Sequence, residues 1–281
     1  MDVNKTTFLR CKDYTVSGET FDLCYNQERD ILQTKPVPNL TALPYYYKSE
    51  AYISHTDSAT SIKDKIYQRV KKYMLAKKIS WLNNYIKGEA KTLLDIGAGT
   101  GDFLKEAKNK NWKIKGIEPN ADARKLALKK GITLCETHAE INTKFSAITM
   151  WHVLEHVPNL ENEISFIKNH LQENGFVFIA VPNFKSYDAA YYKEHWAAYD
   201  VPRHLWHFSK EGIERIFSQQ GFKLCNIHPL IFDAYYVSLL SEKYKHKSTN
   251  FLKAMQLGYK SNRKAKKTGE YSSLVYVFCL K

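Results

Sequence analysis

The pattern of hydrophobic and polar positions changes twice along the chain. Residues 1–59 show no sustained period and contain only two short strand-like pieces, FLRCKDY and ETFDLCYN. Residues 60–88 repeat apolar side chains at the three- and four-residue spacing of an amphipathic helix, which is expected to end at Gly88. From residue 91 onward, short apolar runs alternate with amphipathic stretches, which is the pattern of strands covered by helices.

The alternating region predicts an α/β fold with a mostly parallel sheet that is buried on both faces. Helices are expected between the strands, one of them from the N-cap Ser209 to Gln220, and further helix is expected over 233–268. The expected strands are KTLLDIG, WKIKGIEP, GITLCE, FSAITMW, GFVFIAVPN, GFKLCNIH and SSLVYVFCL.

One segment does not fit a compact alternation of strands and helices. Residues 183–208, NFKSYDAAYYKEHWAAYDVPRHLWHF, form a long connection that is rich in Tyr, Trp and His. Long connections of this kind are usually lids or binding loops. We therefore expect a lid over a ligand site, with a loop that only packs its own aromatic side chains as the alternative.

Composition and charge narrow the class of protein. The 281 residues are 44% hydrophobic and 25% charged, as in ordinary globular domains. No apolar run is long enough to span a bilayer, and the N-terminus lacks the apolar core of a signal peptide, so we expect a cytoplasmic protein. The five cysteines are odd in number and form no C-x-x-C pair, which favours reduced thiols. The net charge of +13 favours anionic partners, although solvated helix faces also explain the lysine clusters.

A glycine-rich turn follows the first strand of the alternating region. In LLDIGAGTG, Asp95 lies at the strand end and Gly97, Gly99 and Gly101 lie in the turn. Glycines allow positive φ and close approach of a ligand to the backbone, while the next helix directs its free N–H groups at the same point. Glu118 follows the second strand, at the position of a carboxylate that binds two ribose hydroxyls. Together these features predict a site for an adenosine-containing cofactor.

The spacing of the glycines separates two kinds of cofactor. A dinucleotide fingerprint, G-x-G-x-x-G/A, requires a small residue at position 102, where this chain has Asp102. The observed G-x-G-x-G, with an acid two residues before it, resembles the class I S-adenosylmethionine-dependent methyltransferases. The run FSAITMWHVLEHVPN is similar to the same family, and in particular to ubiquinone-biosynthesis O-methyltransferases. The resemblance covers about residues 91–281.

The resemblance implies a fold and a division of the chain. We expect a Rossmann-like, doubly wound sheet of seven strands that is mostly parallel and has an antiparallel last strand. An accessory segment over 1–59 would cover the cofactor, and the methyltransferase domain would span 60–281, with the lid at 183–208 and a helical insertion at 233–268.

The resemblance also implies a set of cofactor contacts for S-adenosylmethionine. Asp95 would reach the methionine ammonium, Glu118 would hold the ribose, and the loop after the fourth strand would pass beside the sulfonium and the adenine. Segments before the domain cover the bound cofactor in similar enzymes. The expected cofactor residues are Asp95, Gly97, Ala98, Gly99, Gly101, Glu118, Pro119, His138, Ala139, Met150, Trp151, Tyr52 and His55.

His152, Glu155 and His156 follow the fourth expected strand. Their H-x-x-E-H spacing would place all three on one turn of a helix and is also the signature of one class of zinc peptidase. Such a site needs a continuous helix to hold both imidazoles on one ion. Pro158 keeps the residue before it out of the helical region, and the segment leaves a buried strand directly. We interpret it as the carboxyl-end loop of the fourth strand, where open α/β sheets bind ligands.

The loop that contains His152, Glu155 and His156 is also a candidate site for a metal ion. It is similar to the E-x-x-E-H motif of the ubiquinone-biosynthesis O-methyltransferases, in which the acid/acid/His set is associated with a divalent ion. His152 replaces the first acid, which weakens a hard-cation site. Cys11 and Cys24 near the N-terminus are two ligands short of a closed zinc site. No metal is therefore expected at either place.

Methyl transfer is an in-line displacement, and much of its rate comes from alignment of the reacting atoms. A base is needed only where the acceptor must lose a proton, and a histidine suits that task. We take His152, His156 and His204 as the catalytic candidates, with capping and packing of the loop as the alternative role. His195, Asp200, Arg203 and His207 of the lid are further candidates, and Arg203 could pair with an anionic substrate group.

The expected function is methyl transfer to a small-molecule acceptor, at oxygen or alternatively at nitrogen or carbon, and the acceptor can carry an anionic group. An RNA or tRNA methyltransferase is the alternative, favoured by the charge and by aromatics that could stack bases. Against it, the loop after the fourth strand lacks the Asn/Asp-Pro-Pro-aromatic tetrad, and VPNF at 181–184 follows the fifth strand instead. A cofactor-binding protein without an acceptor site is the third hypothesis.

Overall fold

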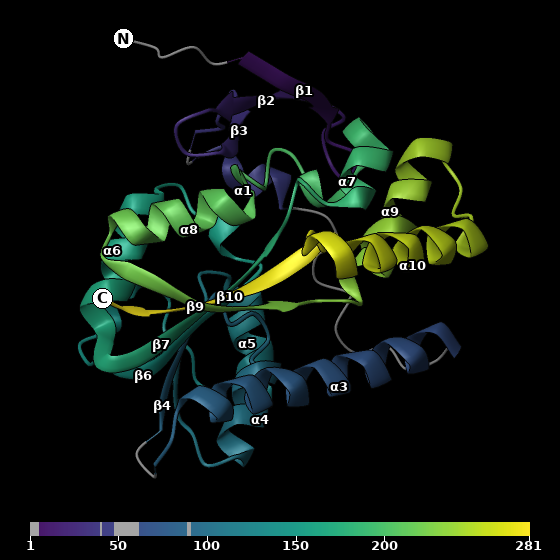
Figure 1. The fold of residues 1–281 in the computed structure, drawn as a ribbon. Helices are drawn as coiled ribbons and strands as arrows, with labels where there is room; N and C mark the ends of the chain where they lie inside the picture. The colour runs from purple at the N-terminus through teal and green to yellow at the C-terminus, as the bar shows by residue number, and fades with distance from the viewer. Residues whose placement is uncertain (1–5, 40, 48–61, 89–90) are drawn as a thin grey trace.

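The chain folds into two β-sheets that lie one above the other (Figure 1), in a computed structural model that describes residues 6–39, 41–47, 62–88 and 91–281. The small sheet has the order β1 (Thr6–Lys12), β2 (Thr20–Asn26), β3 (Ile31–Lys35) and β8 (Trp206–Phe208). The large sheet has the order β5 (Lys113–Ile117), β4 (Thr92–Ile96), β6 (Phe145–Trp151), β7 (Leu171–Pro182), β10 (Ser273–Leu280) and β9 (Phe222–Pro229).

The large sheet is mostly parallel. Strand β4 pairs in parallel with β5 and β6, and β6 pairs in parallel with β7. The last strand, β10, inserts between β7 and β9 and runs antiparallel to both. The expected mixed sheet with an antiparallel last strand is confirmed in this respect. Continuous burial along β6 and the first part of β10 follows from cover on both faces.

Helices cover both faces of the large sheet, as a doubly wound fold requires. One core contains residues of α6 and α8, and another contains residues of α3, α4 and α5. Ser209 caps α8 by accepting the N–H of Gly212, as the sequence predicts. The helices are α1 (Leu43–Tyr46), α3 (Ile62–Tyr85), α4 (Asp102–Asn109), α5 (Ala121–Lys129), α6 (Leu160–His170), α7 (Tyr187–Tyr192), α8 (Lys210–Gln219), α9 (Asp233–His246) and α10 (Phe251–Thr268), with 3₁₀ turns η1 (His138–Glu140), η2 (Leu154–His156), η3 (Lys193–His195) and η4 (Ala197–Tyr199).

The large sheet has six strands in the described part of the chain, so the expectation of seven is wrong in this detail. The segment GITLCE, expected as the third strand, makes one isolated bridge in which Cys135 pairs with Ile117. Pairing stops there because the chain turns at once into η1. The side chains of Thr137 and Glu140 form a capping box that stabilises this turn.

The connection over 183–208 is packed instead of forming an open flap. Its strand β8 pairs with β3 and completes the small sheet. Aromatic side chains of the connection share a core with the N-terminal strands, and the members include Phe21, Leu23, Tyr192, Trp196 and Tyr199. The N-terminal strands and the expected lid therefore form one layer above the large sheet (Figure 1). The boundary at residues 59 and 60 stays a prediction.

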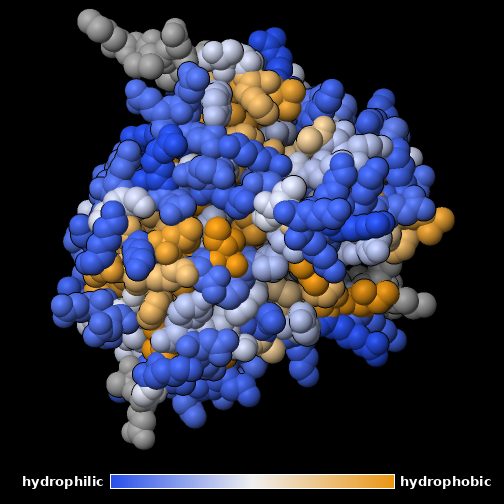
Figure 2. Space-filling view, in the orientation of Figure 1, coloured by the Kyte–Doolittle hydropathy of each residue, from blue (hydrophilic) through white to orange (hydrophobic). Residues whose placement is uncertain are grey.

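Figure 2 shows hydrophilic residues over most of one face, with hydrophobic residues gathered in smaller areas between them. Within the described ranges, no helix has the length and apolar character needed to cross a bilayer.

Candidate functional site

The glycine turn lies where β4 ends and α4 begins. The N–H groups of Gly97 and Ala98 donate to the carbonyl of Ile117 at 2.8 and 2.9 Å, which holds the turn against the end of β5. Gly97, Gly99 and Gly101 all have positive φ, as the sequence predicts. A Cβ at Gly97 would lie 2.4 Å from the side chain of Val153, whereas a Cβ at Gly99 would meet no atom within 4 Å. Gly97 thus permits close packing, and Gly99 faces open space.

The Glu118 carboxylate is bound to the same turn. Its Oε2 accepts the N–H of Gly99 at 2.8 Å, and its Oε1 accepts the N–H of Asn120 at 2.9 Å. The side chain is buried, and each oxygen keeps a second lone pair for another donor. The carboxylate is therefore fixed at the edge of the turn, and both of its oxygens can accept a further hydrogen bond. Pro119 is exposed beside it, and its carbonyl accepts from Arg124 Nη1 at 2.7 Å.

Asp95 lies on β4 beneath the turn and is buried. Burial raises the pKa of its carboxyl to about 7, against a hydrogen bond from Thr149 Oγ1 at 2.6 Å and the positive charge of Lys78. Burial likewise lowers the pKa of Lys78 to about 8, against the charges of Asp95 and Asp233. The Lys78 ammonium lies 4.1 Å from the centre of the Trp151 ring. Lys78 was not among the predicted site residues, because its basic cluster was interpreted as a solvated helix face.

Replacing Asp95 with asparagine should stabilise the chain in a pH-dependent way. The folded-state pKa of about 7 is above the ordinary 3.8, so the folded chain retains a proton that the unfolded chain loses, and stability falls as the pH rises between these values. Asp95→Asn should therefore raise the unfolding free energy by on the order of 2 kcal/mol at pH 8 and by much less at pH 5. Urea denaturation at both pH values measures this difference, and equal effects at pH 5 and pH 8 would contradict it.

Of the other expected cofactor residues that the structure describes, Met150 and Trp151 end β6, and His138 and Ala139 lie in η1. The side chain of Met150 is fully buried in the core, so only its backbone can face a ligand. Trp151 packs edge-on against Phe103. His138 Nε2 lies 3.1 Å from Glu163 Oε1, and this hydrogen bond raises the pKa of His138. Ala139 is exposed. Tyr52 and His55 lie outside the described residues.

The loop after β6 does not form the α-helix that a zinc peptidase motif needs. It contains only the 3₁₀ turn η2, and His152 has φ of 59°. His152 Nε2 lies 3.0 Å from Asp233 Oδ2, and its Nδ1 lies 3.4 Å from Glu155 Oε1. Burial lowers the pKa of His152, but these two carboxylates raise it to a net value of about 10. His152 is therefore a cation at neutral pH and is poorly suited to act as a base.

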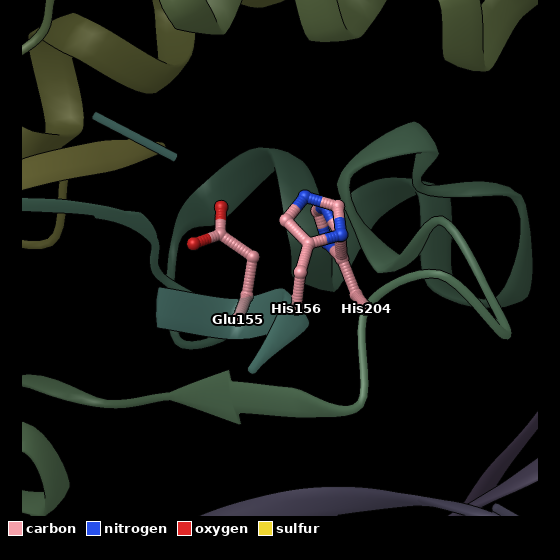
Figure 3. A group of neighbouring side chains, drawn as sticks. All are labelled: Glu155, His156 and His204. Atoms are coloured by element: carbon pink, nitrogen blue, oxygen red, sulfur yellow. The ribbon is translucent and has the colours of Figure 1, made fainter. Parts of the chain in front are cut away.

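His156 and His204 face one another with Glu155 beside them (Figure 3). Their rings are 4.6 Å apart, centre to centre, and nearly perpendicular. His156 Nδ1 lies 3.0 Å from the carbonyl oxygen of Arg203, and His204 Nδ1 lies 2.8 Å from the carbonyl oxygen of Ala198. Burial and the neighbouring His204 lower the pKa of His156 to about 4. The lid thus brings His204 to the loop after β6.

The remaining lid candidates have structural partners. Arg203 is buried and pairs with Asp13 at 2.9 Å and with Asp200 at 2.7 Å, so its guanidinium is already neutralised by protein carboxylates. The proposed pairing of Arg203 with a substrate anion is therefore disfavoured. The His207 ring nitrogen bonds Thr34 Oγ1 at 3.0 Å, where β8 joins β3. His195 lies beside Glu194 and Tyr14 instead of at the loop after β6.

A cavity of about 960 Å³ opens between the two sheets and α9. Its walls come from the end of β1, the lid, the loop after β6 and α9. Asp233 and the tyrosines of α9 were not among the predicted site residues, because nothing in the local sequence shows which loop a helix will face. The lining includes Lys12, Tyr14, His152, Glu155, Asp200, Arg203, His204, Asp233, Tyr236, Lys243, Tyr244 and Lys247.

Comparison with known proteins adds an independent finding. A family model described as a methyltransferase domain matches residues 67–227, more than half of the chain. Ubiquinone biosynthesis O-methyltransferase from Glaesserella parasuis serovar 5 (strain SH0165) is 32% identical over 122 residues, which cover 38% of this chain and 52% of that protein. The chain thus spans about half the length of the curated relatives it matches.

Solved structures are similar in fold. Phosphoethanolamine N-methyltransferase 2 from Haemonchus contortus, in complex with phosphomonomethylethanolamine and S-adenosylhomocysteine, matches with a TM-score of 0.54 at 14% identity, over 88% of this chain and 61% of that one. Magnesium protoporphyrin IX methyltransferase from Synechocystis PCC 6803, with bound S-adenosylhomocysteine, matches with a TM-score of 0.53 at 13% identity, over 81% of this chain and 91% of that one.

Proposed function

Because this chain belongs to the methyltransferase domain family, we propose that it transfers a methyl group from S-adenosylmethionine to a small-molecule acceptor. The observation that carries the proposal is the glycine turn joined to the Glu118 carboxylate at the ends of β4 and β5. Open space at Gly99 and two fixed carboxylate oxygens suit an adenosine whose ribose hydroxyls bind Glu118.

The acceptor would occupy the cavity next to this turn. His152, which lines the cavity, follows Trp151 directly, and the Lys78 ammonium lies over the Trp151 ring. Lys78 is influenced by the charges of both Asp95 and the cavity residue Asp233, so the two sites are neighbours. A donor held at the turn can therefore present its methyl group toward the cavity.

The shape and charge of the cavity favour a small anionic acceptor. Tyr14, in the turn after β1, and Tyr244 of α9 stack beside it with their ring centres 4.7 Å apart and make an aromatic wall. Lys12, Lys243 and Lys247 also line it, and among the described residues no carboxylate forms an ion pair with them. We propose that these lysines hold a carboxylate or phosphate group of the acceptor. An RNA would instead need a continuous basic groove with exposed stacking rings.

The transfer itself is a displacement at carbon. The acceptor atom attacks the methyl carbon of the sulfonium, the carbon–sulfur bond breaks, and S-adenosylhomocysteine leaves with the bonding electron pair. The proton of an acceptor hydroxyl passes to solvent through the cavity. We propose oxygen as the acceptor atom, with nitrogen or carbon as alternatives. The chain contributes alignment of the two reactants, and the His152 cation, fixed by Asp233 and Glu155, can orient an acceptor oxygen in the cavity.

A labelled methyl-transfer assay tests the proposal. The protein is incubated with methyl-labelled S-adenosylmethionine and either a metabolite extract or total RNA, in parallel. We expect label in a low-molecular-mass anionic product and none in RNA. Label in RNA alone would support the alternative acceptor, and label in neither would count against methyl transfer to these two classes.

Glu118→Ala should weaken the binding of S-adenosylmethionine by on the order of 2 kcal/mol, or about 30-fold, through the loss of charge-assisted hydrogen bonds to the ribose. Glu118→Gln should lose less, because an amide oxygen still accepts one hydroxyl. Calorimetric titration measures both affinities. An affinity for S-adenosylmethionine that is the same in Glu118→Ala and the wild type would show that Glu118 only braces the turn.

A further inference from the structure

We propose that Glu155, His156 and His204 form a binding site for one divalent transition-metal ion. One ligand atom from each residue lies within 4.8 Å of the others. Glu155 and His156 come from the turn η2, and His204 comes from the lid, 49 and 48 residues further along the chain, so the fold assembles the set (Figure 3). In the described part of the chain this is the one group of three or more such residues that could share an ion.

The hydrogen bonds of the two histidines fix their free ring nitrogens. A backbone carbonyl only accepts hydrogen bonds, so the contacts to Arg203 and Ala198 place a hydrogen on Nδ1 of both His156 and His204. The Tyr47 hydroxyl lies 3.0 Å from the same His156 nitrogen and then accepts from it as well. In the neutral rings, Nε2 then carries a lone pair. Metal-binding histidines usually have this arrangement, with one nitrogen donating to a carbonyl and the other bound to the ion.

Glu155 supplies the negative charge. It is 1% exposed, and neither carboxylate oxygen has a hydrogen-bond donor in the described structure. A buried carboxylate without donors is strongly unfavourable unless a cation balances it. The His152 cation lies at ion-pair distance from Oε1, with its Nδ1 at 3.4 Å, but Oε2 has no hydrogen-bond partner in the described structure and can accept a further cation.

His152 is not one of the proposed metal ligands, because both of its ring nitrogens already face carboxylates. Its Nε2 is bound to Asp233 at 3.0 Å and its Nδ1 faces Glu155, so neither nitrogen offers a free lone pair to a shared ion. The sequence favoured no metal here because His152 replaces an acid. The structure brings in His204 instead, which no spacing in the sequence reveals.

The ligand types select the class of ion. Two imidazole nitrogens and one carboxylate suit zinc and related transition-metal ions, whereas magnesium and calcium prefer oxygen ligands throughout. Three protein ligands leave coordination positions open, and Glu155 and His204 both line the cavity. On the proposed function, such an ion would supply Lewis-acid polarisation of an acceptor oxygen. The metal-binding proposal itself does not depend on methyl transfer.

Hydrogen bonds between the lid and the loop after β6 hold the three ligand residues near one another even without an ion. The N–H of Leu205 donates to the carbonyl of Glu155 at 2.8 Å, and Trp206 Nε1 donates to the carbonyl of Val157 at 2.9 Å. Together with the bond from His156 to Arg203, these contacts fasten the lid to the loop after β6 on either side of His204. The ligands are therefore held near one another by the fold, as a specific metal site requires.

Metal titration of the full chain tests the proposal. Calorimetry with Zn²⁺ should show one site per chain, Co²⁺ should give a visible absorption band of nitrogen ligation, and Mg²⁺ should not compete. His204→Gln and Glu155→Gln should each weaken Zn²⁺ binding by more than about 10-fold. His195→Ala, a histidine outside the set, should bind Zn²⁺ like the wild type.

A second measurement needs no variant. In a chain with ¹⁵N-labelled histidines, Zn²⁺ should shift the Nε2 resonances of His156 and His204 and leave His207 unchanged. Absence of one-to-one binding, equal affinity in the His204→Gln variant, or shifts confined to other histidines would overturn the proposal. None of these readouts uses catalysis, so they separate failure of the metal site from failure of the proposed transferase activity.

Discussion

Replacing Gly99 with valine should abolish S-adenosylmethionine binding while the chain still folds. A Cβ at this position meets no protein atom within 4 Å, so the valine side chain would enter space that we assign to the cofactor. We expect the dissociation constant to rise by more than about 100-fold, which corresponds to a loss of about 3 kcal/mol. Calorimetry measures the affinity, and circular dichroism with thermal unfolding measures the fold.

Gly88→Val is the matched control. Gly88 also has positive φ, at 95° against 54° for Gly99, and it too has no atom within 4 Å of a built Cβ. Both variants therefore carry a similar backbone cost, on the order of 1–2 kcal/mol, but Gly88 lies before β4, at the opposite end of the strand from the turn. Retained binding in Gly99→Val, or equal loss in both variants, would show that the turn does not contact the cofactor.

Arg203→Met should cause the largest loss of stability, about 3 kcal/mol or more. The change leaves the buried carboxylate of Asp13 without its guanidinium partner, and removal of one member of a buried ion pair is strongly destabilising. The pair joins the N-terminal sheet to the lid, so both should loosen together. Denaturant unfolding measures the free energy, and hydrogen exchange of β1 and β8 shows which layer opens.

Two further variants test whether the loss of stability in Arg203→Met comes from the broken ion pair. Arg10 makes an ion pair of similar length with Asp22 on the surface, at 2.7 Å with the Arg10 side chain 71% exposed, and Arg10→Met should leave stability nearly unchanged. Asp13→Asn combined with Arg203→Met should cost less than the sum of the two single changes. Additive losses would mean that Arg203 acts through its packing alone.

Local features of the fold could be predicted from the sequence because each depends on residues near one another. The Ser209 cap, the positive φ of the turn glycines and the carboxyl-end loop after β6 all follow from short-range geometry. The prediction of a third strand at GITLCE was wrong for an equally local reason, because the capped turn η1 ends the pairing of this segment after Cys135.

The site could be predicted only in part, because its remaining members are assembled by tertiary contacts. His204 was a candidate, but its position against His156 depends on β8 joining β3, which is a non-local pairing. Lys78 and Asp233 are single charges on helices whose faces the local sequence does not assign to a site. Arg203 was a candidate for substrate binding until the structure showed Asp13 as its partner.

The most direct test of the central claim is a crystal structure of the full chain with S-adenosylhomocysteine. We predict that the adenosyl group lies against the turn from Gly97 to Gly101, with its ribose hydroxyls within hydrogen-bond distance of the Glu118 carboxylate. An empty turn at saturating ligand, or a nicotinamide nucleotide bound there in preference, would contradict the account.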